Sequence, residues 1–209
     1  MVLPVLVLLF SVSGQAPPQQ APPPAPVQKP APAPRKIYNE TADAQSQIAT
    51  AIDSIKQDGT RVLIIWGAND DENCTTFQSA MYGGSGAAPA VAQQLRSAMS
   101  DEFRVVTVNV GHLDKNQDLA RTYGAQLAAG ALPHLTVLDT DGKAVAQQST
   151  RDFAAAPGAA APFDSAKIAA FLTKYQAPPP PPAGPLFKAA LEQGKREGKT
   201  VFVWFSAPW

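Results

Sequence analysis

The sequence predicts an α/β domain, a central β-sheet flanked by helices, and three observations support this prediction. Residues 62–66 (VLIIW) are a short apolar run rich in β-branched side chains, which is typical of a strand buried on both faces. Stretches with apolar residues at helical spacing lie before and after this run. Two further short strands, His134–Leu138 and Ala144–Gln148, are separated by an Asp-Gly turn, as in a β-hairpin.

Two proline-rich tracts limit how much of the 209-residue chain can enter a core. Residues 17–36 and 177–185 hold most of the 21 prolines. We expect both to be semi-rigid linkers, because proline lacks a backbone donor and favours polyproline II. Residues 37–176, between them, are enough for one domain. The formal net charge is +0 and no basic cluster is present, which argues against a nucleic-acid partner.

The first 16 residues have the pattern of a secretory signal. Residues 1–12 are almost wholly apolar, and this run is shorter than the roughly 20 residues that span a bilayer. Small residues up to Ala16 would allow cleavage, although no Lys or Arg precedes the apolar run and Pro17 follows the expected cut. We therefore expect an exported protein, periplasmic or extracellular. Its only expected membrane contact is this segment, should it stay uncleaved.

The first half of the domain leads to the only cysteine of the chain. Residues 41–58 carry Ile48, Ile52 and Ile55 at helical spacing, and we expect a helix capped by Thr41 and ended by Gly59. The strand at 62–66 follows directly. A polar loop then leads to Cys74. A single cysteine excludes a disulfide within this chain.

The rest of the domain alternates helical and extended patterns. A glycine-rich run interrupts one helix, and valines alternate with polar residues in the next strand. The predicted elements are a helix at 75–81, a loop at 83–90, a helix from Val91, a strand at 103–110, a short helix at 114–123 and a last helix capped by Asp164 or Ser165.

Two stretches resemble the thioredoxin-like superfamily. In that family a hydrophobic strand leads into W/F-x-A-x-W-C-x-x-C. Residues 66–68 match the lead-in, and Cys74 falls on the second cysteine. Leu132 and Pro133, directly before a strand, match the place of the family's cis-proline. The resemblance covers about residues 41–175 and implies a thioredoxin-like fold, in which a central mixed sheet is flanked by helices.

The attacking cysteine of the family motif is missing. Asp71 stands in its place, and dithiol exchange needs two sulfurs, so the resemblance implies a redox-inactive first domain. Cys74, the only candidate catalytic residue, occupies the position that is more buried in the family. It is either a small buried hydrophobe or a monothiol that forms a mixed disulfide with a partner. The neighbouring carboxylates at 70–72 favour the first interpretation, because negative charge raises the pKa of a thiol.

The resemblance also implies a site for an extended protein or peptide partner. Trp66, Asp71, Leu132 and Pro133 would flank it, since the family presents backbone beside the cis-proline to its substrates. His134 follows, and a pair with the cysteine is conceivable, but no third residue is placed to orient it.

The acidic run at 70–72 raises the question of a cation site. Carboxylates are suitable ligands for hard cations, but their spacing here matches no calcium loop. Asp71 lies where a helix begins, so helix capping explains it. We expect no metal and no cofactor.

Residues 186–209 resemble the start of the same fold again. A helical stretch at 186–194 is followed by GKTVFVWFSAPW, in which a hydrophobic strand leads into F-x-A-P-W. In the family the attacking cysteine comes next. We therefore expect a fragment cut inside a second thioredoxin-like domain. The fragment itself is not expected to be an enzyme. The full protein would be a thiol–disulfide oxidoreductase through its second domain, or alternatively a non-enzymatic pair of binding modules.

Overall fold

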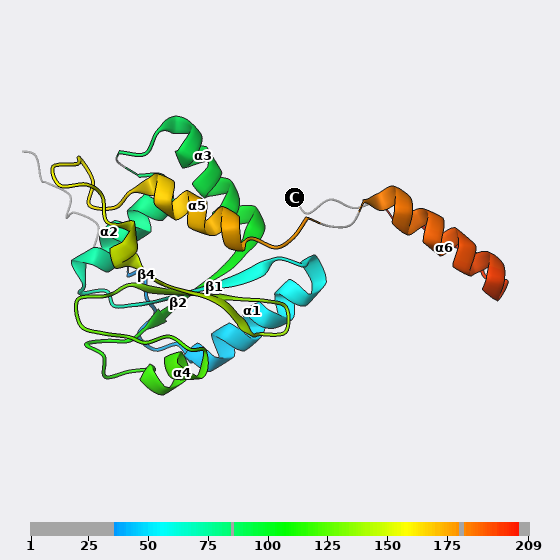
Figure 1. Cartoon of the computed structure of the whole chain (residues 1–209). Coiled ribbons are helices and arrows are strands. Elements are labelled where there is room, and N and C mark those ends of the chain that lie inside the picture. Colours follow the sequence, from blue (N-terminus) through cyan, green and yellow to red (C-terminus); the bar gives the residue numbers. More distant parts are fainter. Residues whose placement is uncertain (1–35, 85, 180–181, 205–209) are drawn as a thin grey trace, which may run out of the picture. The chain divides into compact units, whose positions relative to one another are not determined.

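The structure is a computed structural model that describes residues 36–84, 86–179 and 182–204 (Figure 1). The signal-like segment and most of the first linker lie outside these residues, so the predictions made for them stay predictions. The elements of the domain are α1 (Ala44–Asp58), β1 (Arg61–Gly67), α2 (Glu72–Met81), α3 (Pro89–Ser97), β2 (Phe103–Asn109), α4 (Gln117–Thr122), β3 (His134–Leu138), β4 (Ala144–Ser149) and α5 (Ser165–Tyr175). None of the described helices has the length and hydrophobicity needed to cross a membrane.

The four strands form one mixed sheet in the order β2-β1-β3-β4. Strand β1 pairs in parallel with β2 and antiparallel with β3, and β3 and β4 form the antiparallel hairpin. Trp66 of β1 lies opposite Val108 on one side and His134 on the other. The predicted mixed sheet and the predicted hairpin are therefore confirmed.

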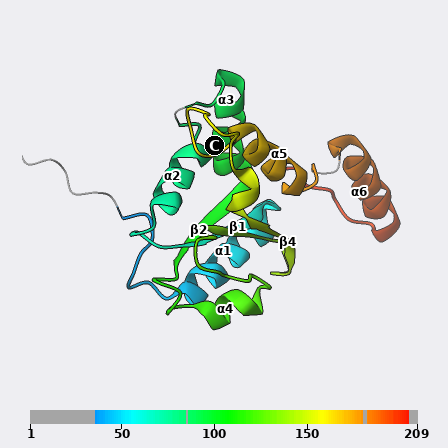
Figure 2. The same cartoon turned by 60° about the vertical axis from the view of Figure 1, so that its left-hand side comes forward.

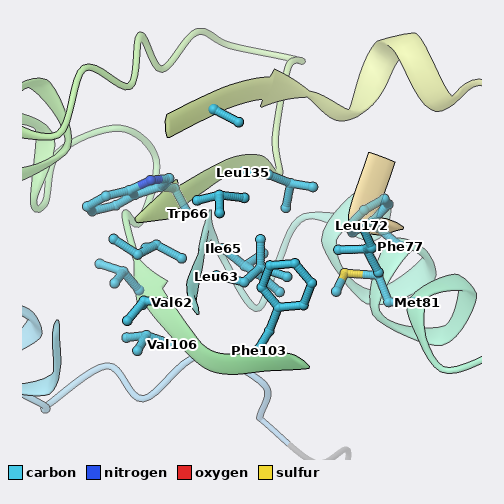
Figure 3. Close-up of a cluster of buried hydrophobic side chains, with 14 of the residues drawn as sticks. Val62, Leu63, Ile65, Trp66, Phe77, Met81, Phe103, Val106, Leu135 and Leu172 are labelled. Atoms are coloured by element: carbon cyan, nitrogen blue, oxygen red, sulfur yellow. The ribbon is translucent and has the colours of Figure 1, made fainter. Parts of the chain in front are cut away.

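Helices cover both faces of the sheet. In two views, α1 and α4 lie on one face, and α2, α3 and α5 lie on the other (Figures 1 and 2). Because β1 is central, its side chains are buried on both faces, which explains why this strand has no polar alternation. Val62 and Trp66 point to one face, whereas Leu63 and Ile65 point towards α2 and α5 (Figure 3). Burying one such side chain contributes about 1.5–3 kcal/mol.

Three helices begin with the same kind of cap, an aspartate whose carboxylate accepts hydrogen bonds from backbone N–H groups of the first turn. These caps are Asp43 for α1, Asp71 for α2 and Asp164 for α5. The prediction that Thr41 caps the first helix is wrong: its N–H and hydroxyl instead contact Asn39, and the helix starts three residues later. The predicted end at Gly59 is confirmed, since this glycine has a φ of 73°.

The glycine-rich run after α2 separates two helices, as predicted. Helix α2 ends at Met81, and α3 begins at Pro89, where proline fits the first helical turn. Helix α4 is only 6 residues long, shorter than the predicted 114–123. Asp114 lies outside it because its carboxylate accepts a hydrogen bond from the N–H of His112 and so stabilises a turn.

The C-terminal segment contains α6 (Ala183–Glu197), which is longer at both ends than the predicted 186–194. The chain turns at Gly198, and the Lys199 N–H donates to the Gly194 carbonyl at 2.9 Å. The predicted strand is wrong for its described part, 199–204, which has no paired neighbour there. Strand structure depends on a partner strand, so the hydrophobic pattern alone does not produce it.

Candidate functional site

Asp71 is the N-cap of helix α2, and the sequence aligns it with the attacking cysteine of the family motif. Its carboxylate accepts hydrogen bonds from the N–H groups of Asn73 at 2.9 Å and Cys74 at 3.3 Å. A carboxylate here also interacts favourably with the positive end of the helix dipole. This carboxylate therefore stabilises the start of the helix, and it has no sulfur to exchange.

Cys74 lies in the first turn of α2 and is 1% exposed. Burial raises the pKa of its thiol to about 11; the Ala68 N–H, which donates to Sγ at 3.5 Å, acts against this rise, and the Asp71 carboxylate adds to it. The thiol is therefore protonated at neutral pH. A protonated, buried thiol is a poor nucleophile, since thiolate is the reactive form.

Tyr38 packs against Cys74 from the N-terminal side of the domain. Its side chain is fully buried, and burial, with the Cys74 thiol as a second cause, raises its pKa above the ordinary value. A Cβ on Gly67 would lie 2.3 Å from the Tyr38 hydroxyl oxygen and 2.8 Å from Cys74 Sγ. Hydroxyl and sulfur thus share the space that a side chain at position 67 would fill. The hydroxyl has no hydrogen-bond partner among the described residues.

His134 lies on the other face of the sheet from Cys74. It is directly opposite Trp66 across the β1–β3 pair, and such residues point to the same face. Its Nε2 is 3.1 Å from Oε1 of Gln147, and the Trp66 indole donates to the Thr136 hydroxyl at 2.9 Å. Burial lowers the pKa of His134, and the contact with Gln147 opposes this. The Cys74–His134 pair considered above does not form.

A groove of about 290 Å³ lies beside the start of α2, and we call it the cis-proline groove because the peptide bond from Leu132 to Pro133 is cis. Its lining residues are Ala68, Asp70, Asp71, Gly111, His112, Leu113, Ala129, Gly130 and Leu132. Of the predicted substrate-binding residues, the structure places Asp71 and Leu132 in this groove. Pro133 is buried and does not line it, and Trp66 lies fully buried within the core.

Two carboxylates give the groove its charge, and one imidazole lies beside them. The Asp70 carboxylate is 2.9 Å from Nε2 of His112, and both side chains are exposed. No Lys or Arg lines the groove. In the described part of the chain, no group of three or more His, Cys, Asp or Glu side chains is arranged to hold a metal ion. The groove therefore offers hydrogen-bonding and acidic groups to a partner.

Sequence patterns missed several residues of this site. The loops at 111–113 and 129–130 were not assigned to it, although they adjoin the ends of β2 and β3, at the edge where β1 leads to Asp71. Positive φ angles at Gly111 and Gly130 indicate tight turns, for which glycine is the available signal. Tyr38 was missed because it follows a proline-rich tract and belongs to no periodic pattern.

The raised pKa of Cys74 predicts how stability depends on pH. The folded state keeps the thiol proton up to about pH 11, whereas the unfolded chain releases it near pH ~8.5. Below pH ~8.5 we expect the free energy of unfolding to be insensitive to this thiol, and above it we expect the free energy of unfolding to fall as the pH rises towards 11. Urea unfolding at several pH values from 7 to 10 measures this fall. The Cys74→Ala variant should show a shallower alkaline fall than the wild type, and equal slopes would contradict the prediction.

Comparison with known proteins gives similarity in structure but not in sequence. No family model matches the chain, and no curated protein matches it. The crystal structure of a disulphide isomerase from Xylella fastidiosa Temecula1 is similar with a TM-score of 0.53 and 22% identity, over 67% of this chain and 96% of that one. A DsbH oxidoreductase gives a TM-score of 0.41 and 18% identity, over 70% and 90% of the two chains. A thioredoxin-fold protein from Helicobacter pylori gives 0.32 and 14%, over 56% and 84%. Together with the mixed sheet covered by helices on both faces, the first of these similarities shows that the chain has a thioredoxin-like fold.

Proposed function

We propose that the domain at residues 37–176 is a redox-inactive binding module for an extended peptide segment of a partner protein. The observation that carries this proposal is that Asp71, which the sequence aligns with the nucleophile of the family motif, caps helix α2. Dithiol exchange needs an attacking and a resolving sulfur, and here only the buried Cys74 is present. Without this pair of sulfurs the site cannot carry out dithiol exchange, but its groove can still bind a peptide.

The cis-proline groove is the proposed peptide site. It combines an apolar floor at Ala68 and Leu132 with two carboxylates at its rim. Asp70 and Asp71 would favour a basic over an acidic peptide, because oppositely charged groups steer association and suppress the wrong partner. The groove is small, so we expect contact with a few residues and modest affinity.

Substitution at two neighbouring alanines tests this site. Ala129 lines the groove and Ala128 does not, and both are exposed. We expect Ala129→Trp to weaken binding by about tenfold or more, since filling the groove removes the contact area on which affinity depends. Fluorescence anisotropy measures the affinity for a labelled, unstructured decapeptide composed of Ser, Val and Lys. The same measurement is made with a counterpart in which Glu replaces Lys.

Ala128→Trp is the matched control and should leave binding within about threefold, as expected for a substitution outside the contact surface. Equal binding by both variants, or preference for the acidic peptide, would contradict the proposed site. Insulin reduction by the 209-residue chain would contradict its redox inactivity.

For the whole protein we propose export and thiol–disulfide exchange in a second thioredoxin-like domain. Apolar side chains on α6 and after it support this second domain: Leu186, Phe187, Leu191, Phe202 and Trp204 are exposed, and several line an apolar groove of about 710 Å³. Large exposed apolar surfaces mark interaction sites, and the remainder of a domain would cover this one. The alternative is a pair of binding modules without redox activity.

The sequence and activity of a gene product that extends past Trp209 distinguish a redox-active second domain from a pair of binding modules. A C-x-x-C motif directly after the F-x-A-P-W stretch, with insulin reduction lost on its mutation to serine, is the expected result. A continuation without this motif would favour two binding modules. Recovery of the protein from the periplasm or the medium, with a shortened N-terminus, tests export.

A further inference from the structure

Residues 36–40 form a strap beside the cysteine loop, and hydrogen bonds from two side chains, one backbone bridge and the buried Tyr38 ring hold it. The backbone of the strap makes one isolated parallel bridge, from Asn39 to Val108. The Thr107 hydroxyl donates to the Ile37 carbonyl at 3.0 Å, and the side chain of Asn69 supplies three more hydrogen bonds to the strap backbone. Its Oδ1 accepts from two consecutive N–H groups at 2.9 Å each, and its Nδ2 donates to the Tyr38 carbonyl at 2.8 Å. A segment held in this way can open locally while the sheet stays folded.

The strap also carries the side chain that covers the cysteine. Tyr38 is fully buried, and its hydroxyl lies beside the Cys74 sulfur without a hydrogen-bond partner among the described residues. A buried hydroxyl without a partner is unfavourable, and opening of the strap returns it to water. The same movement removes the ring from the thiol. Opening of the strap therefore also exposes the Cys74 thiol.

We propose that Cys74 is a conditional modification site, which opening of the strap exposes to low-molecular-weight disulfides. The proposal goes beyond the binding function above, which concerns the closed state. In the open state the thiol releases its proton to solvent, and the thiolate attacks one sulfur of the small disulfide. A mixed disulfide forms on Cys74, and the other half leaves as a thiolate. Cys74 is the only cysteine of the chain, so no neighbour within the chain resolves the adduct.

Reaction with an aromatic disulfide, dithiobis(nitrobenzoate), tests the proposal on the full chain, because each exchange releases a coloured thiolate. We expect the wild-type rate to depend weakly on urea below the unfolding transition, since strap opening exposes little surface. Asn69→Ala should raise the rate about tenfold or more, because it removes four hydrogen bonds between the Asn69 side chain and the strap.

Asn73→Ala is the matched control. Asn73 is exposed, lies next to Cys74 and makes no side-chain hydrogen bond to the strap. The exchange rate of the Asn73→Ala variant should therefore stay within about twofold of the wild-type rate. The urea dependence keeps the test decisive even if Asn69→Ala lowers overall stability. A steep dependence, equal to that of global unfolding in both wild type and Asn69→Ala, would overturn the proposal. An exchange rate of Asn69→Ala no faster than that of Asn73→Ala would also overturn the proposal.

Discussion

Replacing Asp71 by cysteine is expected to produce a disulfide with Cys74. The two positions are three residues apart at the start of α2, and Asp71 already reaches the Cys74 N–H at 3.3 Å. Residues at this spacing lie on one side of a helix, roughly 5–6 Å apart, which is within the range that a disulfide spans. Oxidation of the variant by oxidised glutathione should remove both thiols and the mass of two hydrogen atoms, as read by mass spectrometry.

The neighbouring substitution Asp70→Cys is the control. Asp70 is exposed and faces His112, so a cysteine there should stay a free thiol or form a glutathione adduct. Loss of the Asp71 cap costs about 1 kcal/mol in the reduced variant, and the disulfide offsets this cost when it forms. Two free thiols in oxidised Asp71→Cys would show that position 71 is not equivalent to the missing nucleophile.

Replacing Gly67 by alanine is expected to destabilise the domain by about 1–3 kcal/mol, because the new Cβ overpacks a filled site. That atom would lie 2.3 Å from the hydroxyl oxygen and 2.5 Å from the ring carbon Cζ of Tyr38, and 2.8 Å from Cys74 Sγ. The structure shows no positive φ at Gly67, so the cost is steric and involves no backbone strain. Urea unfolding monitored by circular dichroism gives the difference in free energy of unfolding.

A double-mutant cycle with Tyr38→Ala assigns this cost to the contact. In that background the clash with the ring is gone, so Gly67→Ala should cost clearly less than it does alone. Gly184→Ala controls for the change of residue type, since a Cβ there meets nothing within 4 Å. Equal costs of Gly67→Ala with and without the Tyr38 ring would contradict the packing described here.

Short-range patterns gave correct predictions because the interactions behind them span only a few residues. The buried strand at 62–66, the hairpin and the glycine that ends α1 each depend on periodicity or on turn chemistry within one element. The wrong cap at Thr41 came from the same kind of reasoning, since Asp43, two residues later, offers a better acceptor. The strand expected after Gly198 is absent from residues 199–204, where no partner strand lies beside the chain.

Sequence alone determined the fold class, a thioredoxin-like α/β domain. The interpretation that a carboxylate replaces the attacking sulfur stays a prediction. Only the tertiary structure decided which side chains surround Cys74. Strand register places His134 on the opposite face, and Asn69 brings Tyr38, 31 residues away in sequence, over the thiol. Such contacts depend on how distant strands and loops align in space, and no local pattern encodes that alignment.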